Sequence, residues 1–469
     1  MSEMYAKLKN DWLLRGWIDT PMAVVNWATG DVRQLTKKGF YVAESCDGRT
    51  DFDSLAFLPE HHGLLEALIK EGIAEMCQEG DTIEPWQHYR KANNPRLTGI
   101  HWCVTGLCNL NCRHCYMESP SGRFGELPFE DIVRLIEQFE RANVLQISLT
   151  GGEPFLRQDI LDIIAMLAEK RIHLSQIYSN GLLITEDHLN AIRKIGFSPS
   201  FQISFDGVNV HEYMRGSKGI EWGVIDAIRR VRAAGFQVVV ATSIDKISSG
   251  RLIDTYELMK GLDIQSWHIA SPQEAGNWRK TTTALSLNEE ADVYVPLLDR
   301  WRKDGKPFYI QLAGFFRGGQ TSKKEAPIYG KSDGNVRPEY TWESYDCGTC
   351  REQPNLLPDG TLVPCPAYVD SIMQERMPNL LHEDLSKVWT KSILRKIADI
   401  KKKDLLAKNP ECSACELFAN CGLGCRASAL METGDLMAKD PISCKLWKNG
   451  HKKRFEDLAM TVTNREIGL

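Results

Sequence analysis

The spacing of its fourteen cysteines constrains this chain more than any other feature. Three of them fall within one short run, Cys108 to Cys115, and eight fall between Cys347 and Cys444. The N-terminus lacks the charged, then apolar, then small-residue order of a secretion signal, so we expect a cytoplasmic protein, in which disulfides rarely persist. Metal binding is then the natural role for so many thiols, and their distribution predicts two separate metal-binding regions.

Composition limits the classes of function. The chain has 469 residues, 43% of them apolar, which is enough for about three domains of ~150 residues each. The formal net charge is -5, so no broad basic surface is expected for nucleic acid. No apolar run reaches the ~18 residues of a membrane-spanning helix. We therefore expect a soluble protein with neither nucleic acid nor membrane as a partner.

The section from residue 98 to 285 predicts an α/β fold. Strand-like runs alternate there with amphipathic helical segments such as FEDIVRLIEQFERA. The six runs are IHWCVTG, LQISLTG, LSQIYSN, FQISFDG, FQVVVAT and SWHIASP. Six βα units imply a parallel sheet that curls into a partial (βα)6 barrel of the TIM type, with its chemistry at the carboxyl ends of the strands.

The first cysteine group follows the first predicted strand, in the run CNLNCRHCY. Cys108, Cys112 and Cys115 have the spacing CxxxCxxC, and three thiolates can hold three irons of a 4Fe-4S cluster while the fourth iron stays open to another ligand. Zinc is the alternative, but a structural zinc site needs four ligands. We expect the loop to keep the neighbouring His114 from turning inward.

The next strand ends carry groups suited to a small polar ligand. Two glycines before Glu153 let the backbone approach a ligand closely, and the Glu153 carboxylate can accept from an ammonium group. Arg215 is a candidate partner for a carboxylate. The candidate contacts at these strand ends are Gly151, Gly152, Glu153, Asn180, Ser204, Asp206 and Arg215. Because four consecutive strand ends place polar groups on one face, the pattern predicts a single site.

CxxxCxxC followed by an aromatic residue, here Tyr116, resembles the radical S-adenosylmethionine (radical SAM) superfamily, and the resemblance covers the whole βα section. It implies that S-adenosylmethionine chelates the open iron and that one electron cleaves it to methionine and a 5'-deoxyadenosyl radical. The same resemblance assigns Gly151, Gly152 and Glu153 to the methionine amino group. It assigns Asn180, Ser204 and Asp206 to the ribose, and makes Arg215 a partner for the methionine carboxylate.

The eight C-terminal cysteines equal two full sets of four, the number that saturates two 4Fe-4S clusters. Their pattern over residues 345–450 resembles the SPASM domain of radical peptide maturases. The resemblance implies a first auxiliary cluster on Cys347, Cys350, Cys365 and Cys425, and a second on Cys412, Cys415, Cys421 and Cys444. Either Cys347 or Cys350 satisfies the spacing to Gly360, so one iron is free if only one of them binds. A pair of zinc ribbons is the alternative.

The rest of the C-terminal half gives weaker signals. The section has little regular periodicity, so we expect a fold held by metal rather than by an apolar core. A connecting region, 286–344, has one helical pattern at NEEADVYVPLLDRWRKDG and a polar loop around residues 317–340, and residues 451–469 form a tail. Cys46, Cys77 and Cys103 have no partner spacing and are expected to be small core residues.

Residues 1–90 predict a small winged-helix-like unit. LLRGW, AVVNW and DVRQL are strand-like, and HHGLLEALIKEGIAEM has helical spacing. Nine Lys and Arg against fifteen Asp and Glu give the wrong sign for binding DNA. The order of elements resembles the PqqD-like recognition element of enzymes that mature ribosomally made peptides. That resemblance implies that a leader peptide adds as a strand to an exposed sheet edge.

Together these patterns predict a maturase similar to those of sactipeptides and ranthipeptides. It would use three 4Fe-4S clusters, S-adenosylmethionine and a flavodoxin- or ferredoxin-type electron donor, and would cross-link the core of a precursor peptide, most often through a Cys thioether. Two alternatives stay open: a formylglycine-forming enzyme similar to anaerobic sulfatase maturases, and a regulator that senses redox state through its clusters. The sequence assigns no general acid or base.

Overall fold

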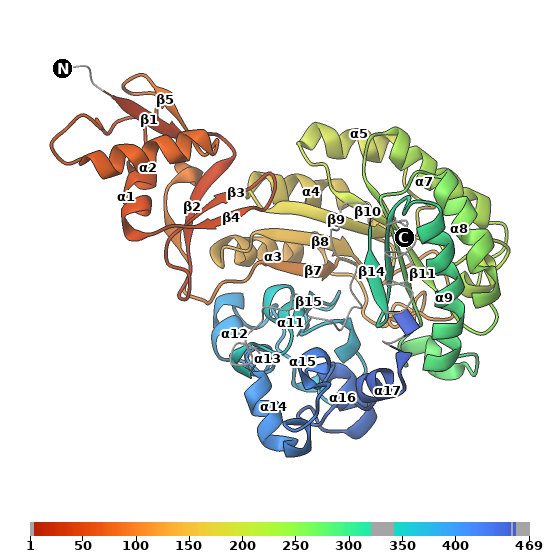
Figure 1. The fold of residues 1–469 in the computed structure, drawn as a ribbon. Coiled ribbons are helices and arrows are strands. Elements are labelled where there is room, and N and C mark those ends of the chain that lie inside the picture. Colours follow the sequence, from red (N-terminus) through yellow and green to blue (C-terminus); the bar gives the residue numbers. More distant parts are fainter. Residues whose placement is uncertain (1–3, 320–341, 452–453, 456–469) are drawn as a thin grey trace, which may run out of the picture.

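A ten-stranded sheet forms the centre of the protein, seen here in a computed structural model that describes residues 4–319, 342–451 and 454–455. Strands β7 to β13 run parallel, β15 adds in parallel beside β7, and the end strands β14 and β16 are antiparallel to their neighbours (Figure 1). The order across the sheet is β14 (Phe316–Gly318), β13 (Tyr309–Leu312), β12 (Ser266–Ala270), β11 (Val238–Ser243), β10 (Ser200–Ser204), β9 (His173–Ser179), β8 (Gln146–Thr150), β7 (Gly99–Cys103), β15 (Asn355–Leu356) and β16 (Leu362–Val363).

The six predicted strands are β7 to β12, so the βα alternation was interpreted correctly. Each is short and rich in β-branched or aromatic residues, and the segments between them have the apolar stripe of a helix that packs on a sheet. The helices of this section are α3 (Phe129–Arg141), α4 (Ile160–Glu169), α5 (Glu186–Ile195), α6 (His211–Arg215), α7 (Glu221–Ala233), α8 (Leu252–Gly261) and α9 (Leu287–Lys303).

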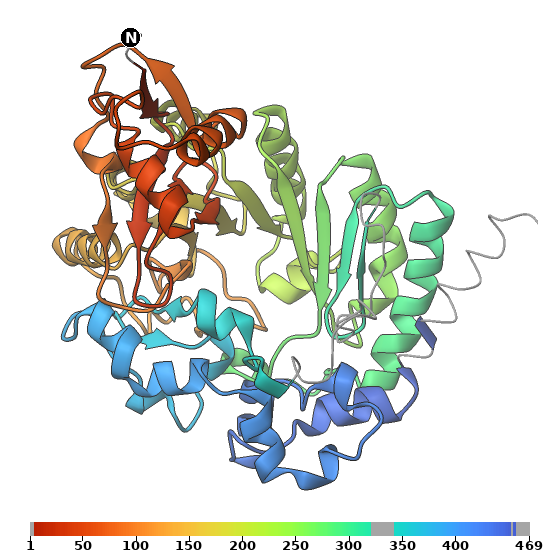
Figure 2. The ribbon, with the colours of Figure 1, turned by 60° about the vertical axis from the view of Figure 1, so that its left-hand side comes forward.

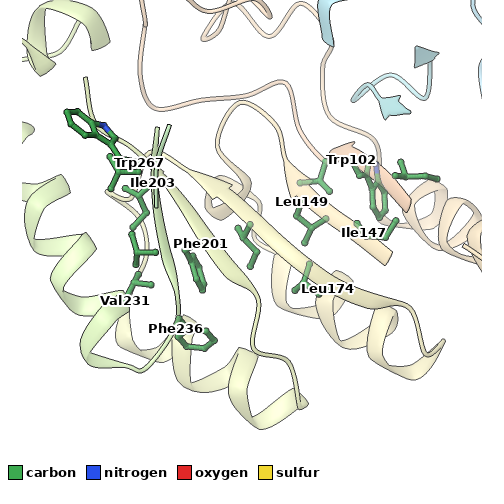
Figure 3. Packing of buried hydrophobic residues seen from close by; sticks show 14 of the residues in the cluster. Trp102, Ile147, Leu149, Leu174, Phe201, Ile203, Val231, Phe236 and Trp267 are labelled. Atoms are coloured by element: carbon green, nitrogen blue, oxygen red, sulfur yellow. The ribbon is translucent and has the colours of Figure 1, made fainter. Parts of the chain in front are cut away.

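The main core lies between one face of this sheet and its helices (Figure 3). Strand residues such as Trp102, Leu149 and Ile203 are fully buried there and meet helix residues such as Val231. Side chains alternate between the two faces of a strand, so the neighbours of these residues face the opposite side of the sheet. That side is the concave interior of the predicted barrel.

The sheet is wider than the sequence predicted. The connecting region contains the expected helix, α9, but it also adds β13 and β14 to one edge, and β15 and β16 extend the other edge from the C-terminal section. These strands have two to four residues, too few for periodicity to identify them. Most of the polar loop predicted at 317–340, and most of the tail at 451–469, lie outside the described residues.

The N-terminal unit has two small sheets and two helices around its own core. Its elements are β1 (Tyr5–Leu8), β2 (Trp12–Gly16), β3 (Ala23–Asn26), β4 (Val32–Gln34), α1 (Lys37–Ser45), α2 (Pro59–Lys70), β5 (Ala74–Cys77) and β6 (Arg90–Lys91). The strands pair in the orders β1-β5 and β4-β3-β2-β6. The strand-and-helix content was predicted; the winged-helix assignment stays a prediction.

This unit packs on the loops that precede the strands of the large sheet (Figures 1 and 2). Trp17 Nε1 donates to the carbonyl of Ala142, and Asn143 Nδ2 donates to the carbonyl of Gly16. The Arg171 guanidinium stacks on the ring of Trp27 at 4.9 Å. Ala142 and Asn143 precede β8, and Arg171 precedes β9, so the unit covers the amino ends of these strands.

The C-terminal section corrects one expectation, because it has a substantial apolar core. Trp389 and Leu394 belong to the main core, and Tyr368 and Val369 pack with Met117 from the barrel. Its aperiodic sequence concealed this, since short helices and loops supply the apolar residues. The helices are α11 (Gly348–Glu352), α12 (Leu385–Lys391), α13 (Ile393–Ala398), α14 (Lys402–Lys408), α15 (Phe418–Cys421), α16 (Arg426–Thr433) and α17 (Pro441–Lys448). No helix of the described residues is both long and apolar enough to cross a bilayer.

Glu290 on α9 makes stability depend on pH. Burial raises the pKa of this carboxyl to about 7. The folded state therefore binds the proton more tightly than the unfolded state, and the stabilisation is complete below pH ~4.5 and is lost as the pH rises to ~7, by up to about 3 kcal/mol. We expect Glu290→Gln to reduce this loss, measured as the change in urea midpoint of anaerobic, metal-free protein between pH ~5 and ~8.

Asp292→Asn is the matched control, since Asp292 lies on the same helix with an exposed side chain. It should keep the pH dependence of the natural protein. An equal loss of stability with pH in Glu290→Gln would show that the buried carboxyl is not the cause.

Candidate functional site

The CxxxCxxC loop lies at the carboxyl edge of the sheet, between β7 and α3, and amide groups surround its sulfurs. The Leu110 N–H donates to Cys108 Sγ at 3.4 Å and the Ser119 N–H to Cys115 Sγ at 3.3 Å. Arg215 Nη1 lies 3.7 Å from Cys112 Sγ. Burial raises the pKa of Cys108 to about 12 and also raises that of Cys112. Such thiols ionise when a metal binds them, and the N–H donors then stabilise the thiolates.

The Gly-Gly-Glu turn after β8 packs directly against the start of the cysteine loop. The Gly152 N–H donates to the Thr105 carbonyl at 2.7 Å, and the Glu153 N–H donates to the Leu107 carbonyl at 2.9 Å. A Cβ on Gly152 would lie 2.0 Å from Leu107 O, and one on Gly151 would lie 2.6 Å from Thr105 O. Glycine is therefore required at both positions, because only bare backbone fits between the two segments.

The Glu153 carboxylate joins two strand ends. It is fully buried and accepts from Ser179 Oγ at 2.8 Å and from the Asn180 N–H at 2.7 Å. Burial raises its pKa to about 7, although these hydrogen bonds oppose the rise. Asn180 in turn donates through Nδ2 to Asn109 Oδ1 at 2.8 Å, inside the cysteine loop. Both predicted ligand contacts thus hold the loop in place, and their roles toward a ligand stay predictions.

Asp206 and Arg215 form a buried ion pair with each other. Arg215 Nε lies 2.6 Å from Asp206 Oδ2, and Nη2 lies 3.0 Å from Oδ1, which also accepts from the Ser243 N–H at 3.0 Å. Burial alone would raise the pKa of Asp206, but Arg215 keeps it below its usual value. The sequence predicted separate ligand contacts for these residues and did not predict their pairing. Ser204 lies half-buried at the end of β10.

Two histidines beside this pair were not predicted. His211 Nδ1 accepts from the Asp206 N–H at 3.1 Å, and its ring stacks on Phe205. His114 is half-buried and its Nδ1 is shielded from solvent, with no hydrogen-bond partner among the described residues, while the direction of its ring relative to the three thiols stays a prediction. Burial lowers the pKa of each to about 4, so both are neutral at pH 7. Residues four apart on a helix lie on the same face, so the spacing from His211 to Arg215 is the signal that could have identified His211 as a neighbour of the pair.

A loop after β12 holds the cysteine loop from the other side. The Asn277 N–H donates to the Cys115 carbonyl at 3.0 Å, and Asn277 Nδ2 donates to the Cys112 carbonyl at 3.2 Å. Tyr116 directs its hydroxyl to the buried Cys103 thiol, with 3.6 Å between Oη and Sγ. Cys103 and Cys46 are core residues, as predicted, whereas Cys77 is half-buried.

The structure brings the first set of C-terminal cysteines together. The Cys350 thiol lies close enough to Cys347 and Cys365 to lower the pKa of each. Cys425 is close enough to Cys365 for the charge of one to raise the pKa of the other. Burial raises the pKa of Tyr368, and the charges of all four thiols raise it further. Tyr368 therefore lies beside the whole set. Cys347 and Cys350 are thus both in reach of one cluster, although which of them binds stays a prediction.

The second set lines one pocket. Its walls contain Cys412, Cys415, Cys421 and Cys444 together with the side chains of Glu411, Leu417, Phe418, Leu423, Lys439, Asp440, Trp447 and Lys448. Ser443 Oγ lies 3.5 Å from Cys421 Sγ and can donate to it. Four thiols around one partly apolar space fit a 4Fe-4S cluster. Among the described residues, no three His, Cys, Asp or Glu side chains converge closely enough for a single metal ion.

Comparisons with known proteins agree with this geometry. A profile of the Radical SAM superfamily matches residues 102–259, and one of the SPASM iron-sulfur cluster-binding domain matches residues 347–416. The fold and site therefore define a radical SAM enzyme, with S-adenosylmethionine and iron-sulfur clusters as its cofactors. More specifically, the chain carries both a radical SAM domain and a SPASM domain.

Two curated relatives illustrate the range of this class. The AdoMet-dependent heme synthase of Methanosarcina barkeri is 28% identical over 364 residues, which cover 74% of this chain and 96% of the relative. The PqqA peptide cyclase of Gluconobacter oxydans is 25% identical over 347 residues, which cover 73% and 89%. The relatives therefore differ in the substrates that their names state.

Two solved structures share the fold. Streptococcus suis SuiB bound to its precursor peptide SuiA has a TM-score of 0.65 at 15% identity and covers 93% of this chain and 99% of its own. anSMEcpe with bound AdoMet has a TM-score of 0.58 at 18% identity and covers 79% and 100%. The alignment with SuiB covers more of this chain than the alignment with anSMEcpe and extends beyond the two matched domains. Most of this chain therefore has a known fold.

The Asp206–Arg215 pair gives a test of this site. Arg215→Met leaves a buried carboxylate without its partner, so we expect a loss of about 3–5 kcal/mol in the free energy of unfolding. Adding Asp206→Asn should recover much of that loss. The measurement is urea unfolding of anaerobic, metal-free protein followed by fluorescence.

Arg113→Met is the matched control, because Arg113 is exposed and packs its guanidinium over the Tyr213 ring at 4.3 Å. It should cost less than about 1 kcal/mol. If the double variant is as unstable as Arg215→Met alone, the pair is not the stabilising unit described here.

Proposed function

We propose that this enzyme modifies a ribosomally made precursor peptide, whose leader binds residues 1–90 and whose core segment enters the barrel at the carboxyl edge of the sheet. The observation that carries the proposal is the N-terminal unit, which has its own core, a fixed place on the barrel and free strand edges. The names of SuiB's peptide complex and of the PqqA cyclase support a peptide substrate.

Two strand edges of this unit can accept a leader. Within the described part of the N-terminal unit, the outer edges of β4 and β5 pair with no other strand. In an antiparallel pair, the backbone groups of successive residues point alternately toward the partner strand and away from it. On β4, Leu35 N donates to Met22 O, so the N–H of the preceding residue, Gln34, points outward. On the β5 side, Lys9 N donates to Ile73 O, and the same alternation turns the N–H of Met76 outward. A leader strand could bond to either edge, and the acidic charge of the unit favours a leader that carries Lys or Arg.

The barrel interior suits a peptide. Strands β7 to β13 contain no Asp, Glu, Lys or Arg. The residues that alternate with the core include His101, Ser148, Tyr178, Gln202, His268 and Gln311. His101 Nδ1 lies 2.9 Å from Ser148 Oγ, and burial lowers the His101 pKa to about 4, so this wall is polar and neutral. Such groups match the amides of a peptide, whereas the carboxylates of a tetrapyrrole would need cations.

The proposed leader-binding unit and the cysteine loop lie far apart. The N-terminal unit covers the amino ends of β8 and β9, while the cysteine loop lies at the carboxyl ends. A five-residue strand is ~17 Å long, so leader and core must be joined by at least about five extended residues, and by more if the chain passes around a helix. Tethering of this kind raises the local concentration of a weakly bound core.

The chemistry follows from the proposed ligands. Bound S-adenosylmethionine, reduced by one electron, supplies the radical that removes a hydrogen atom from the core segment. Cys108, Cys112 and Cys115 hold the cluster for this step, and Asn277 and Arg215 fix the loop that carries them. The two C-terminal sets would hold two auxiliary clusters, which make three clusters together with the first. The auxiliary clusters would return the surplus electron to a flavodoxin- or ferredoxin-type partner. A Cys thioether is the leading product, followed by a carbon-carbon or carbon-oxygen link.

The alternatives differ in what they require of residues 1–90. An enzyme similar to sulfatase maturases oxidises a Cys or Ser in a short substrate without a leader-binding unit, and a redox sensor cleaves no cofactor. A tetrapyrrole-modifying enzyme, as some relatives are named, needs no peptide at all.

Proline substitution tests the leader edges in the full-length enzyme. Gln34→Pro and Met76→Pro each remove one outward N–H without removing a bond to the neighbouring strand. We expect one of them to weaken binding of a labelled precursor, encoded beside the gene, at least tenfold, and Gln34→Ala and Met76→Ala to bind normally. The same proline should slow the mass change of the precursor. Unchanged binding in both proline variants, or turnover of a tetrapyrrole instead, would overturn the proposal.

Cys115→Ala tests the first cluster. We expect no 5'-deoxyadenosine from S-adenosylmethionine under anaerobic reduction, together with loss of one cluster's iron and sulfide, because two thiols cannot hold the cube. Cys77→Ala should retain full cofactor cleavage. Persistent cleavage in Cys115→Ala, or zinc in place of iron in the natural enzyme, would exclude this assignment.

A further inference from the structure

A buried group of three charged residues lies between the two C-terminal cysteine sets. Arg426 Nε lies 3.1 Å from Asp346 Oδ2, and Lys402 Nζ lies 3.2 Å from Asp346 Oδ1. The exposed fractions of the side chains are 2% for Arg426, 3% for Asp346 and 7% for Lys402. Because two cations share one anion, this triad carries an excess positive charge inside the protein.

The triad touches both sets through the chain. Asp346 directly precedes Cys347 in the chain. Arg426 directly follows Cys425, so the first set has a triad residue beside two of its members. Lys402 Nζ also donates to the Gly422 carbonyl at 2.8 Å, next to Cys421 of the second set.

The backbone around the triad leaves these side chains little freedom. A Cβ on Gly422, which has a positive φ of 54°, would lie 2.2 Å from Lys402 Nζ, so the lysine fills the space that a side chain would need. Arg426 also donates to the carbonyls of Leu423, Leu436 and Ala438 at 2.6 to 3.0 Å. The segment Cys421 to Cys425, which joins the two sets, is therefore held from both ends.

A buried ionic triad is seldom the most stable choice, since apolar residues of similar size often stabilise a protein more. An excess cation becomes favourable where anionic groups lie close by. Two clusters, each held by four thiolates, are anionic and gain one further negative charge on reduction. Their charge would compensate the triad.

We propose that Asp346, Arg426 and Lys402 are positioning residues that fix the separation of the two auxiliary clusters, and that the net positive charge of the triad raises the reduction potentials of these clusters. The inference rests on the proposal that both sets hold iron-sulfur clusters. A cation near a cluster stabilises the reduced, more negative form, and an anion destabilises it. The three residues thus set how readily each cluster accepts an electron.

The test measures potentials, not turnover. In full-length protein with Cys108, Cys112 and Cys115 all changed to Ala, only the auxiliary clusters remain, and their midpoint potentials follow from anaerobic redox titration monitored by electron paramagnetic resonance. We expect Lys402→Met to shift at least one midpoint to lower potential and Asp346→Asn to shift it to higher potential. Lys402→Arg should restore the natural value.

Lys401→Met and Lys403→Met are the matched controls. Both residues flank Lys402 but pair with Glu343 at the surface, where solvent and salt screen their charge. Neither should move a midpoint. The shifts at Lys402 and Asp346 should also persist at high ionic strength, because the triad is buried.

The outcomes separate the two proposals. Shifts of opposite sign support the triad, whereas unchanged midpoints, or shifts in the same direction, overturn it and leave the proposed function intact. If the triple-alanine protein binds no iron and sulfide in its C-terminal half, the cluster assignment and the triad both fall. If Lys402→Met loses its clusters, Asp346→Asn decides alone: a raised midpoint supports the triad, and any other result overturns it.

Discussion

The close approach of the Gly-Gly-Glu turn to the cysteine loop determines how the rest of the site is built. With Gly152 packed against the Leu107 carbonyl, the loop cannot move away from the strand ends without breaking two backbone hydrogen bonds. Glu153 then links the turn to the end of β9 by accepting from the Asn180 N–H, and Asn277 bonds to the cysteine loop from the opposite side. Three thiols on a short loop become a defined site only because several strand ends hold that loop.

Among the described residues, charged side chains are absent from some parts of the site and concentrated in others. The strands that line the barrel carry no ionised residue, so the interior is polar but neutral. Two groups of buried charges lie beside the cysteines: the Asp206–Arg215 pair next to Cys112, and the triad around Asp346 between the two C-terminal sets. Because an isolated buried charge costs several kcal/mol, each of these groups is paired, and each pair lies where anionic ligands are proposed to bind.

Sequence reasoning succeeded where a signal is local and repeated. The six strands β7 to β12 and helix α9 were predicted because their apolar residues recur with the period of a strand or a helix. It failed for β13 to β16, which are short, and for the apolar core around Trp389, whose residues come from segments without periodicity. His114 shows a third limit: the sequence could not predict that it lies close to Arg215 and Asp206, which are remote from it along the chain.

The sequence by itself determined the chemistry, because cysteine spacing is a covalent property and CxxxCxxC presents three thiols whatever surrounds it. It also determined the α/β class through its alternating periods. Only the tertiary structure decided which groups meet: that Glu153 and Asn180 hold the loop, that Asp206 binds Arg215, and that Cys347 and Cys350 both lie beside Cys365. Contacts of this kind depend on distances between strand ends that are remote in sequence, and no local pattern of residues encodes those distances.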